Sequence, residues 1–343
     1  MAPVITRSDI GEITYIDGTV EITRDGEIID EIDLDIGSEI ENYDNIRTGA
    51  DSELYITVES DRSPQTEIHI AANTVFTVDI NSNEGNQVTT LGLITGSFGA
   101  KVGKLTGSQY FEVKTESVAM SVRGTGFLVQ TSPASDVLVT CDEGEVVCRD
   151  QDSGSMVSAE PGQIVEKLPD ELFRSVPVAV SQLEDFRKDW IAERIALFKP
   201  NALRVLRQYA ERYDDLYNRF NAEYEALMLE KAVLEKWMRE DAEGKVGGRI
   251  QLMQEKKEII GHLFEIRGVL FIFERIYYRL LELHSYFQQG FGRGQIKPGL
   301  SAAIFFERLT AQQKDLHEKI GGVRYIMKLY ALRNDGELPL SRF

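Results

Sequence analysis

The change of hydrophobic period near residue 180 constrains the fold of this chain more than any other feature. Before it, short runs of alternating apolar and polar residues are separated by turn dipeptides such as Asp17-Gly18 and Asp25-Gly26, which is typical of β-strands. After it, apolar residues recur at steps of three and four, the period of an α-helix. A chain of 343 residues is long enough for two packed domains. The sequence therefore predicts an α+β protein made of two separate domains.

The predicted first domain covers residues 1–170 and is all-β. Further turns are expected at Glu143-Gly144 and Pro161-Gly162. Many short strands without intervening helices favour one all-β module, and their spacing fits either a sandwich or a solenoid of stacked strands. Strands are expected over 12–16, 19–23, 31–36, 53–58, 66–70 and 110–114.

The predicted second domain is an elongated helical bundle over 181–335, after a linker at 171–180 and before a C-terminal tail at 336–343. A short helix at 181–198 and three long helices are expected, with glycine-rich reversals at 243–249 and 289–301. Each long segment carries an apolar seam of the kind found in coiled coils. We therefore expect a long antiparallel bundle that stands off the β domain as a rod. The run "VLFIF" at 269–273 is apolar all round, which places the second long helix deepest.

Net charge separates the two halves as clearly as periodicity does. Residues 1–170 hold 31 acidic and 10 basic side chains and the remainder 25 and 28, giving −21 and +3 of the total −18. The acidic half repels phosphate backbones, so nucleic acid is not an expected partner. No stretch reaches the roughly 20 apolar residues of a membrane-spanning helix. The opening "MAPVITRSD" has no basic and apolar leader, which fits either a cytosolic protein or an exported one whose signal peptide was removed.

Motifs of catalysis or metal binding are weak. The four histidines, at 69, 262, 284 and 317, lack metal or catalytic spacing, and His284 falls on a helical seam where packing is expected. "GFGRG" at 290–294 follows no predicted strand and is interpreted as an inter-helix linker. "DLDIGSE" at 33–39 offers oxygen ligands for calcium, but its apolar alternation fits a half-exposed strand. No enzyme activity, cofactor or metal is therefore predicted.

Cys141 and Cys148 flank the Glu143-Gly144 turn. A two-residue hairpin there would place both sulfurs on one face as diagonal neighbours, which is too wide for an unstrained disulfide. A one-residue change of register would bring them together. Two buried thiols are the preferred interpretation, with a disulfide as the alternative.

The segment "VAMSVRGTGFLV" at 118–129 changes the parity of its apolar alternation across Gly124-Thr125-Gly126. Such a slip marks a bulge or a corner. Gly124 would allow a backbone conformation that a side chain forbids, Arg123 would pair with a carboxylate, and Thr125 would bind a turn amide. Together with Phe127, these residues are interpreted as a structural motif rather than a binding site.

The β half resembles the FecR domain. The resemblance rests on the ordered succession of "GEITYIDGTVEI", "LDIGSEIENYDNIRTGADSELYITV", "LGLITGSFGAKV", "YFEVKTESVAMSVRGTGFLV", "VTCDEGEVV" and "AEPGQIVE" between about Gly11 and Lys167. It implies a solenoid-like extracytoplasmic module and a periplasmic location. The best-known members relay the state of an outer-membrane transporter to a sigma factor. This chain has a helical bundle where they have anti-sigma, membrane and secretin/TonB-like parts.

The favoured hypothesis is a non-enzymatic periplasmic scaffold that binds other proteins of a cell-envelope assembly, of which a motor or a secretion apparatus is an example. The bundle also offers a surface for forming a homo-oligomer. The alternative is a sensory or regulatory protein of FecR type that acts through partner chains. A second alternative, a carbohydrate-binding module, would need an aromatic platform on the β face.

Overall fold

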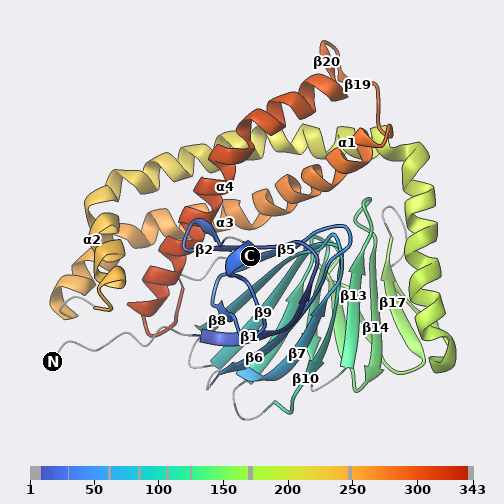
Figure 1. Cartoon of the computed structure of the whole chain (residues 1–343), viewed down its shortest axis with the longest axis horizontal. Helices are drawn as coiled ribbons and strands as arrows, with labels where there is room; N and C mark the ends of the chain where they lie inside the picture. Colours follow the sequence, from blue (N-terminus) through green and yellow to red (C-terminus); the bar gives the residue numbers. More distant parts are fainter. Residues whose placement is uncertain are drawn as a thin grey trace.

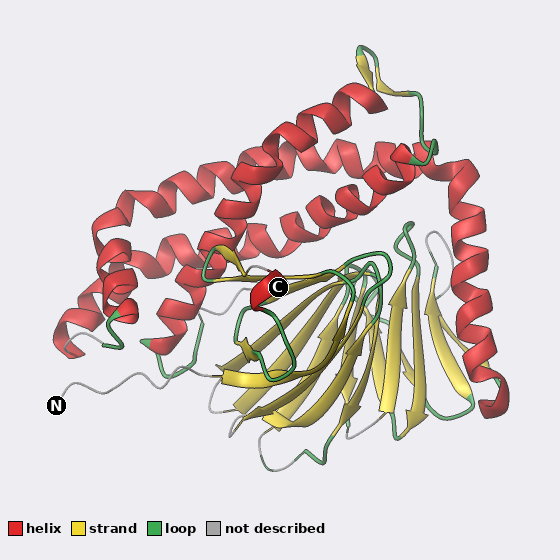
Figure 2. Cartoon of the chain, viewed as in Figure 1, coloured by secondary structure: helices red, strands yellow, loops and turns green. Residues whose placement is uncertain are grey.

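The computed structural model describes residues 9–29, 31–60, 63–83, 86–105, 107, 109–123, 126–168, 173–245 and 249–338. It contains an N-terminal β region and a C-terminal helical region, as predicted (Figures 1 and 2). Two nine-stranded sheets form the β region, and neither closes into a barrel over the described residues. A solenoid arrangement of these strands stays a prediction.

The first sheet has the order β18-β17-β14-β13-β10-β7-β6-β1-β4. The second has the order β16-β15-β12-β11-β9-β8-β5-β2-β3, and its β9–β11 pair is parallel. Strands of the first sheet are β1 (Asp9–Asp17), β4 (Glu39–Glu41), β6 (Glu53–Ser60), β7 (Ser63–Ile70), β10 (Ser97–Val102), β13 (Gly126–Thr131), β14 (Val137–Glu143), β17 (Gln163–Lys167) and β18 (Arg174–Pro177). Strands of the second are β2 (Val20–Arg24), β3 (Glu27–Ile29), β5 (Asn45–Thr48), β8 (Val75–Asn83), β9 (Asn86–Thr95), β11 (Gln109–Lys114), β12 (Val118–Val122), β15 (Val146–Asp150) and β16 (Met156–Ala159).

The two sheets share one apolar core. Ile13 and Phe98 from the first sheet and Ile22 and Phe76 from the second are all fully buried in it. Phe76 contacts Phe98 edge to face, with 4.9 Å between ring centroids. Since each such side chain contributes about 1.5–3 kcal/mol on burial, this core is the main force holding the sheets together.

Tight turns carry the chain from one sheet to the other. Gly18 and Gly144 have φ of 72° and 83°, a conformation that favours glycine. They connect β1 to β2 and β14 to β15, which belong to different sheets. The expected turn at Glu143-Gly144 is present, but it does not close a hairpin between Cys141 and Cys148, because β14 pairs with β13 and β17 instead. Asp25-Gly26, in contrast, closes a true hairpin of β2 and β3.

One predicted strand is absent. Residues 31–36 contain a short 3₁₀ helix, η1 (Glu31–Asp33), and the chain turns at residues 36 and 37. Leu34 is buried, but Ile32 and Ile36 are exposed. Their apolar alternation therefore does not reflect a strand that covers the core.

The helices are α1 (Leu183–Leu227), α2 (Lys231–Ala242), α3 (Arg249–Gln288) and α4 (Ala302–Leu332). Short 3₁₀ segments, η2 (Val180–Gln182) and η3 (Met228–Glu230), precede and follow α1. Both predicted reversals fall between helices. The first, at 243–249, lies partly outside the described residues, and the second contains a small hairpin of β19 (Gln295–Lys297) and β20 (Leu300–Ser301). The predicted short helix at 181–198 is not separate, since α1 continues through Pro200, and the first long helix is interrupted at η3.

The second long helix, α3, is deeply buried as expected, although its most buried residues lie after the predicted run at 269–273. Every residue from 273 to 280 is buried, whereas Phe271 in the predicted run is 40% exposed. Phe273 stacks on Phe220 of α1 with 4.7 Å between ring centroids. Coiled-coil geometry along the seams stays a prediction. None of the described helices combines the length and the apolar composition needed to cross a membrane.

The helices lie along the β region instead of standing off it. In Figures 1 and 2 they extend across one end of the two sheets, and the first part of α1 runs beside β17. Tyr43, Val75 and Ile94 of the β region belong to the same apolar cluster as the helices. The predicted rod is therefore wrong. Part of the predicted linker, residues 174–177, forms the edge strand β18.

Candidate functional site

Buried polar side chains gather where the helices contact the β region, and we call this contact the junction. Two arginines of α3 anchor it. Arg279 is 1% exposed and donates to the carbonyl oxygens of Ser132 at 2.7 Å and Ile94 at 3.1 Å. Arg275 donates to the carbonyl of Thr115, and burial lowers its pKa to about 10. These bonds satisfy loop carbonyls that packing against a helix would otherwise leave without partners.

A buried ion pair connects α4 to α3 and to the second sheet. Arg324 donates to Glu274 through Nε at 2.7 Å and Nη2 at 2.8 Å, a bidentate geometry. Asp79 of β8 lies 3.6 Å from Arg324 Nη1. Burial alone would lower the pKa of Arg324, but the carboxylates of Glu274 and Asp79 outweigh it and raise that pKa. The guanidinium is thus held in its charged form.

Lys328, one helical turn further along α4, binds two carboxylates of the β region. Its Nζ lies 2.7 Å from Asp25 and 2.6 Å from Glu41. Arg24 also contacts Glu41, at 3.2 Å, and pairs with Asp44 through two nitrogens. Burial raises the pKa of Asp44 to about 6, although the Arg24 contact opposes the shift. Acidic groups of the β region are therefore matched by cations here.

Glu116 joins α1 to the loop after β11. Tyr209 donates to its carboxylate at 2.6 Å, Ser135 at 3.0 Å and Arg212 at 2.9 Å. Burial favours the neutral acid, but the bond from Tyr209 and the nearby arginines prevail and lower the pKa of Glu116. This carboxylate stays ionised and fixes α1 against the sheets.

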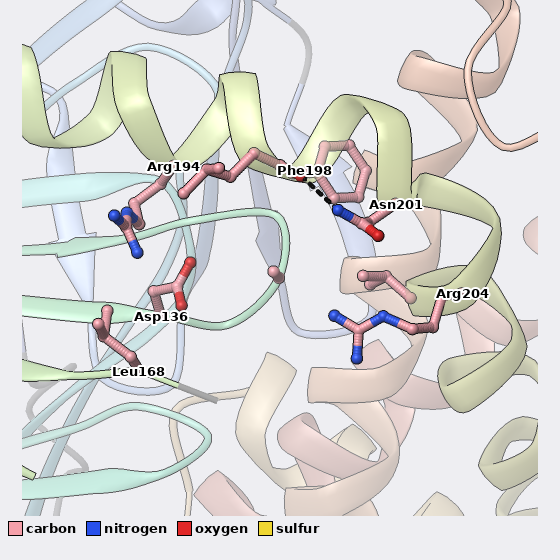
Figure 3. A pocket seen from close by; sticks show the side chains of 9 residues that line it. Asp136, Leu168, Arg194, Phe198, Asn201 and Arg204 are labelled. Carbon is pink, nitrogen blue, oxygen red and sulfur yellow. Dashed lines mark hydrogen bonds between the residues drawn. The ribbon is translucent and has the colours of Figure 1, made fainter. Parts of the chain in front are cut away.

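A cavity of about 150 Å³ lies beside the junction, between α1 and the loop before β14 (Figure 3). Its lining combines apolar side chains with Asp136, Arg194, Asn201 and Arg204. α1 contains Pro200, and proline within a helix removes a backbone hydrogen bond and bends the axis. Figure 1 shows α1 as two segments at a marked angle. The cavity lies where α1 contains this proline.

The predicted structural motif is only partly described. Gly124 and Thr125 lie outside the described residues. Arg123 is exposed and forms no hydrogen bond or ion pair within the part of the chain that the structure describes. Phe127 is 2% exposed and packs edge to face on Phe98 in the shared core. The segment connects β12 of the second sheet to β13 of the first, and its architectural role stays a prediction.

Cys141 and Cys148 are free and buried, on strands of different sheets. Burial raises the pKa of Cys141 to about 11 and raises that of Cys148 as well. Both sulfurs therefore remain thiols near neutral pH and are poor nucleophiles.

The histidines are dispersed. His284 stacks on Phe306 at 4.7 Å and burial lowers its pKa, while His317 of α4 contacts the hydroxyl of Thr23 at 3.1 Å. His69 stacks on Tyr55, which meets Tyr15 edge to face on the outer side of the first sheet. Across the described ranges, no three histidine, cysteine or carboxylate side chains gather as metal ligands.

Sequence reasoning missed the junction entirely. Its one usable signal is in α4, where Arg324 and Lys328 are four residues apart within the otherwise apolar run "VRYIMKLYAL". Charges at i and i+4 on an apolar helix face imply a buried polar partner. The partners themselves come from α3, from strands β4 and β8 and from the turn after β2, all distant in sequence, and no pattern identifies them.

Comparisons with known proteins find a matching family and similar solved structures. Residues 44–147 match the family described as FecR protein. Two crystal structures of a protein assigned provisionally as an anti-sigma factor, from Parabacteroides distasonis ATCC 8503, are similar to part of this chain. Identities are 15% and 14%, TM-scores are 0.35 and 0.34, and each alignment covers 41% of this chain. The chain spans 62% and 63% of those two structures. No curated protein matches the sequence.

Proposed function

We propose that this chain, which carries a FecR domain over residues 44–147, is a non-enzymatic regulatory protein that relays the state of the envelope or of a transport system through partner chains. The family match is the main observation that supports the proposal. It extends from β5 to the start of β15 and thus includes strands of both sheets. The regulatory alternative is better supported than the scaffold, which depended on a helical rod acting as a spacer.

The junction suggests how such a relay would operate. Asp79, Ile94, Thr115, Glu116 and Ser132 all lie within the matched residues, and all of them contact the helices. A partner that moves these strand ends and loops would therefore shift α1, α3 and α4. Because the contacts combine ion pairs with hydrogen bonds from buried arginines to backbone carbonyls, the two regions would move as coupled bodies.

Deletion of the gene tests the proposal. We expect altered transcription of a limited set of transport genes, measured by RNA sequencing with and without the transported substrate, and restoration by the full chain. An unchanged transcript profile under both conditions would contradict regulation. Recovery of stoichiometric structural proteins in a pull-down, with that unchanged profile, would instead favour the scaffold in a motor, a secretion apparatus or another envelope assembly.

Periplasmic location and partner binding are part of the proposal. The FecR resemblance supports export, and osmotic-shock fractionation of cells expressing the native gene tests it. Other envelope proteins are the expected partners. Self-association through the helical region is a further proposal, and light scattering coupled to gel filtration would detect it as a doubled mass.

Carbohydrate binding is kept as a second candidate for one reason. Tyr15, Tyr55 and His69 form an exposed ring cluster on the first sheet, with centroid separations of 5.6 and 4.4 Å. Rings of this kind can stack on sugars. Here, however, Tyr55 and His69 stack on each other, which leaves less ring face for a ligand. Absence of binding on a glycan array would remove this candidate.

A further inference from the structure

We propose that the outer face of the first sheet binds an aromatic side chain of a partner protein in a slot over Gly99, together with a basic residue of the same partner segment. The slot is the space that a side chain at Gly99 would fill. The proposal does not depend on the regulatory function, because a scaffold would bind a partner through the same slot.

Gly99 interrupts a row of side chains that crosses the first sheet. The cross-strand neighbours in this row are, in order, Tyr15 of β1, Tyr55 of β6, His69 of β7, Gly99 of β10 and Leu128 of β13. The last four of these strands lie side by side in Figure 1. Along those four strands, the residues before and after each member of the row are buried in the shared core. Since successive side chains of a strand point to opposite faces, the row lies on the outer face.

No side chain of the described residues fills the position over Gly99. A Cβ atom added there would meet, apart from its chain neighbours, a single described atom within 4 Å, the carbonyl oxygen of Phe127 at 3.6 Å. The φ of Gly99 is not positive, and β10 pairs with both neighbouring strands without a bulge. Neither backbone conformation nor crowding therefore requires glycine here. A glycine inside a strand weakens that strand and often marks a place that a ligand approaches closely.

His69 and Leu128 form the two walls of the slot. His69 stacks on Tyr55 with 4.4 Å between ring centroids and 12° between the ring planes. Because these residues are on neighbouring strands, the ring faces point from strand to strand, and the second face of the imidazole is directed toward the space over Gly99. Neighbouring strands lie about 4.8 Å apart, so the walls are roughly 9.6 Å apart. A ring midway between them would lie at stacking distance from His69.

The floor of the slot favours a flat ring without hydroxyl groups. It is the backbone of a strand that is paired on both sides, at Gly99 with His69 and with Leu128. A sugar ring that entered edge-on would press hydroxyl groups against this floor, where they would lose their water without gaining partners. An aromatic ring loses mainly apolar surface, which is favourable. Tryptophan fits best because it has the largest ring face.

Acidic side chains around the row select the charge of the partner. Glu12 and Asp17 belong to β1, Glu53 to β6 and Glu67 to β7, and Lys101 of β10 is the cross-strand neighbour of Glu67. These four carboxylates and one ammonium group, all at least partly exposed, carry a net charge of −3. Charge complementarity therefore favours a partner segment in which arginine or lysine flanks the aromatic residue.

A capped pentapeptide with tryptophan between two arginines is the probe, and the full chain is the receptor. Two matched peptides replace the tryptophan by alanine or the two arginines by glutamates. Binding is measured from shifts of the backbone amide resonances of residues 67–71, 97–101 and 126–130. A single side chain in one slot should bind with a Kd on the order of 1 mM. Both matched peptides should bind at least fivefold more weakly.

Three variants locate the binding. Gly99→Phe fills the slot from within, so it should abolish peptide binding and raise the urea midpoint of unfolding, because it replaces a glycine that weakens the strand. His69→Ala removes one wall and should weaken the peptide about fivefold. Ser121→Phe places the same new ring at an exposed site on β12 of the second sheet and should leave binding unchanged. Circular dichroism verifies that each variant is folded.

Several results would overturn the proposal. They are the absence of resonance shifts at about 5 mM peptide, equal binding of either matched peptide, or undiminished binding by Gly99→Phe and His69→Ala. Maltose shifting the same resonances, with no effect of the tryptophan peptide, would assign the slot to sugars instead. A doubled mass in light scattering that Gly99→Phe returns to the monomer would assign it to a second copy of this chain.

Discussion

At the scale of single residues, the pair of Arg324 and Glu274 shows how desolvation and charge attraction oppose each other in the stability of the junction. Both side chains are nearly completely buried, and their two hydrogen bonds are 2.7 and 2.8 Å long. Desolvation offsets much of the attraction in such a pair. Loss of Glu274, however, leaves the buried Arg324 with only the longer 3.6 Å contact to Asp79, so its charge is poorly compensated.

Replacing Glu274 by Gln should therefore destabilise the fold by about 3 kcal/mol or more, measured as the free energy of unfolding in urea. The double variant Glu274→Leu with Arg324→Met removes both members of the pair and should cost less than the single one, although it also removes the cation near Asp79, whose side chain is 24% exposed. Lys314→Gln breaks the exposed Lys314–Glu318 pair and should change stability by less than about 0.5 kcal/mol. Equal effects of Glu274→Gln and Lys314→Gln would show that the junction pair is unimportant.

Single residues also show where sequence patterns succeed. Val118, Met120 and Val122 alternate in the sequence and all face the core, because a strand with one buried face requires period two. Arg324 and Lys328 could not be placed in the same way. Their environment is made by Asp79, Asp25 and Glu41, which lie far away along the chain.

At the scale of elements, α1 combines two roles that the sequence suggested were separate helices. Its first part packs on the outer face of the first sheet, where Leu183 and Trp190 form a small apolar cluster with Leu138, Ile164 and Leu168. Its second part joins the helical core. The angle between the two parts lets one helix serve both surfaces (Figure 1).

Trp190→Ala should release the first part of α1 from the sheet. Loss of a large buried aromatic side chain costs about 3–5 kcal/mol in a core. We expect the remaining apolar contacts of this small cluster to be too weak to hold the first part of α1 on the sheet. We expect faster tryptic cleavage at Arg187, Lys188 and Arg194, with fragments identified by mass spectrometry. Val180→Ala, at an exposed site nearby, is the control. Cleavage at the wild-type rate would contradict an anchoring role for Trp190.

The contact of α4 with β2 should be sensitive to acid. Burial lowers the pKa of His317, whose ring lies 3.1 Å from the Thr23 hydroxyl, with Glu21, Arg47 and Glu318 as its charged neighbours. The unfolded chain therefore binds a proton more readily than the folded one. This contribution to stability is complete above the unfolded pKa of about 6.5 and is lost as the pH falls. His317→Gln should reduce the loss of unfolding free energy between pH 7.5 and 5.5. An identical loss in that variant would exclude His317 as a cause.

At the scale of the whole molecule, the two predicted regions exist but are not independent bodies. Periodicity was sufficient to separate strands from helices, and turn glycines such as Gly18 and Gly144 marked where strands end. Which strands pair could not be predicted, because period two identifies the face that is buried and not the neighbour, as Cys141 and Cys148 illustrate. The position of the helices could not be predicted either, because it depends on loop carbonyls and single charges.

One cooperative unfolding transition is therefore expected for the full chain. Far-ultraviolet circular dichroism reports mainly the helices, and the fluorescence of Trp190 and Trp237 reports the α1 anchor and the helical core. Both signals should share one midpoint in urea. Two separated midpoints would show that the regions unfold independently, as the rod arrangement would have required.

The anchoring of Arg279 to both Ile94 and Ser132 has a consequence for synthesis on the ribosome. Those two carbonyls are near each other only after their strands have joined the sheets, and they leave the ribosome well before Arg279 does. The nascent β region can keep these carbonyls and its surplus carboxylates hydrated while it awaits the helices. The order of the two regions along the gene thus brings the acidic part into water first and the cationic side chains of the helices last.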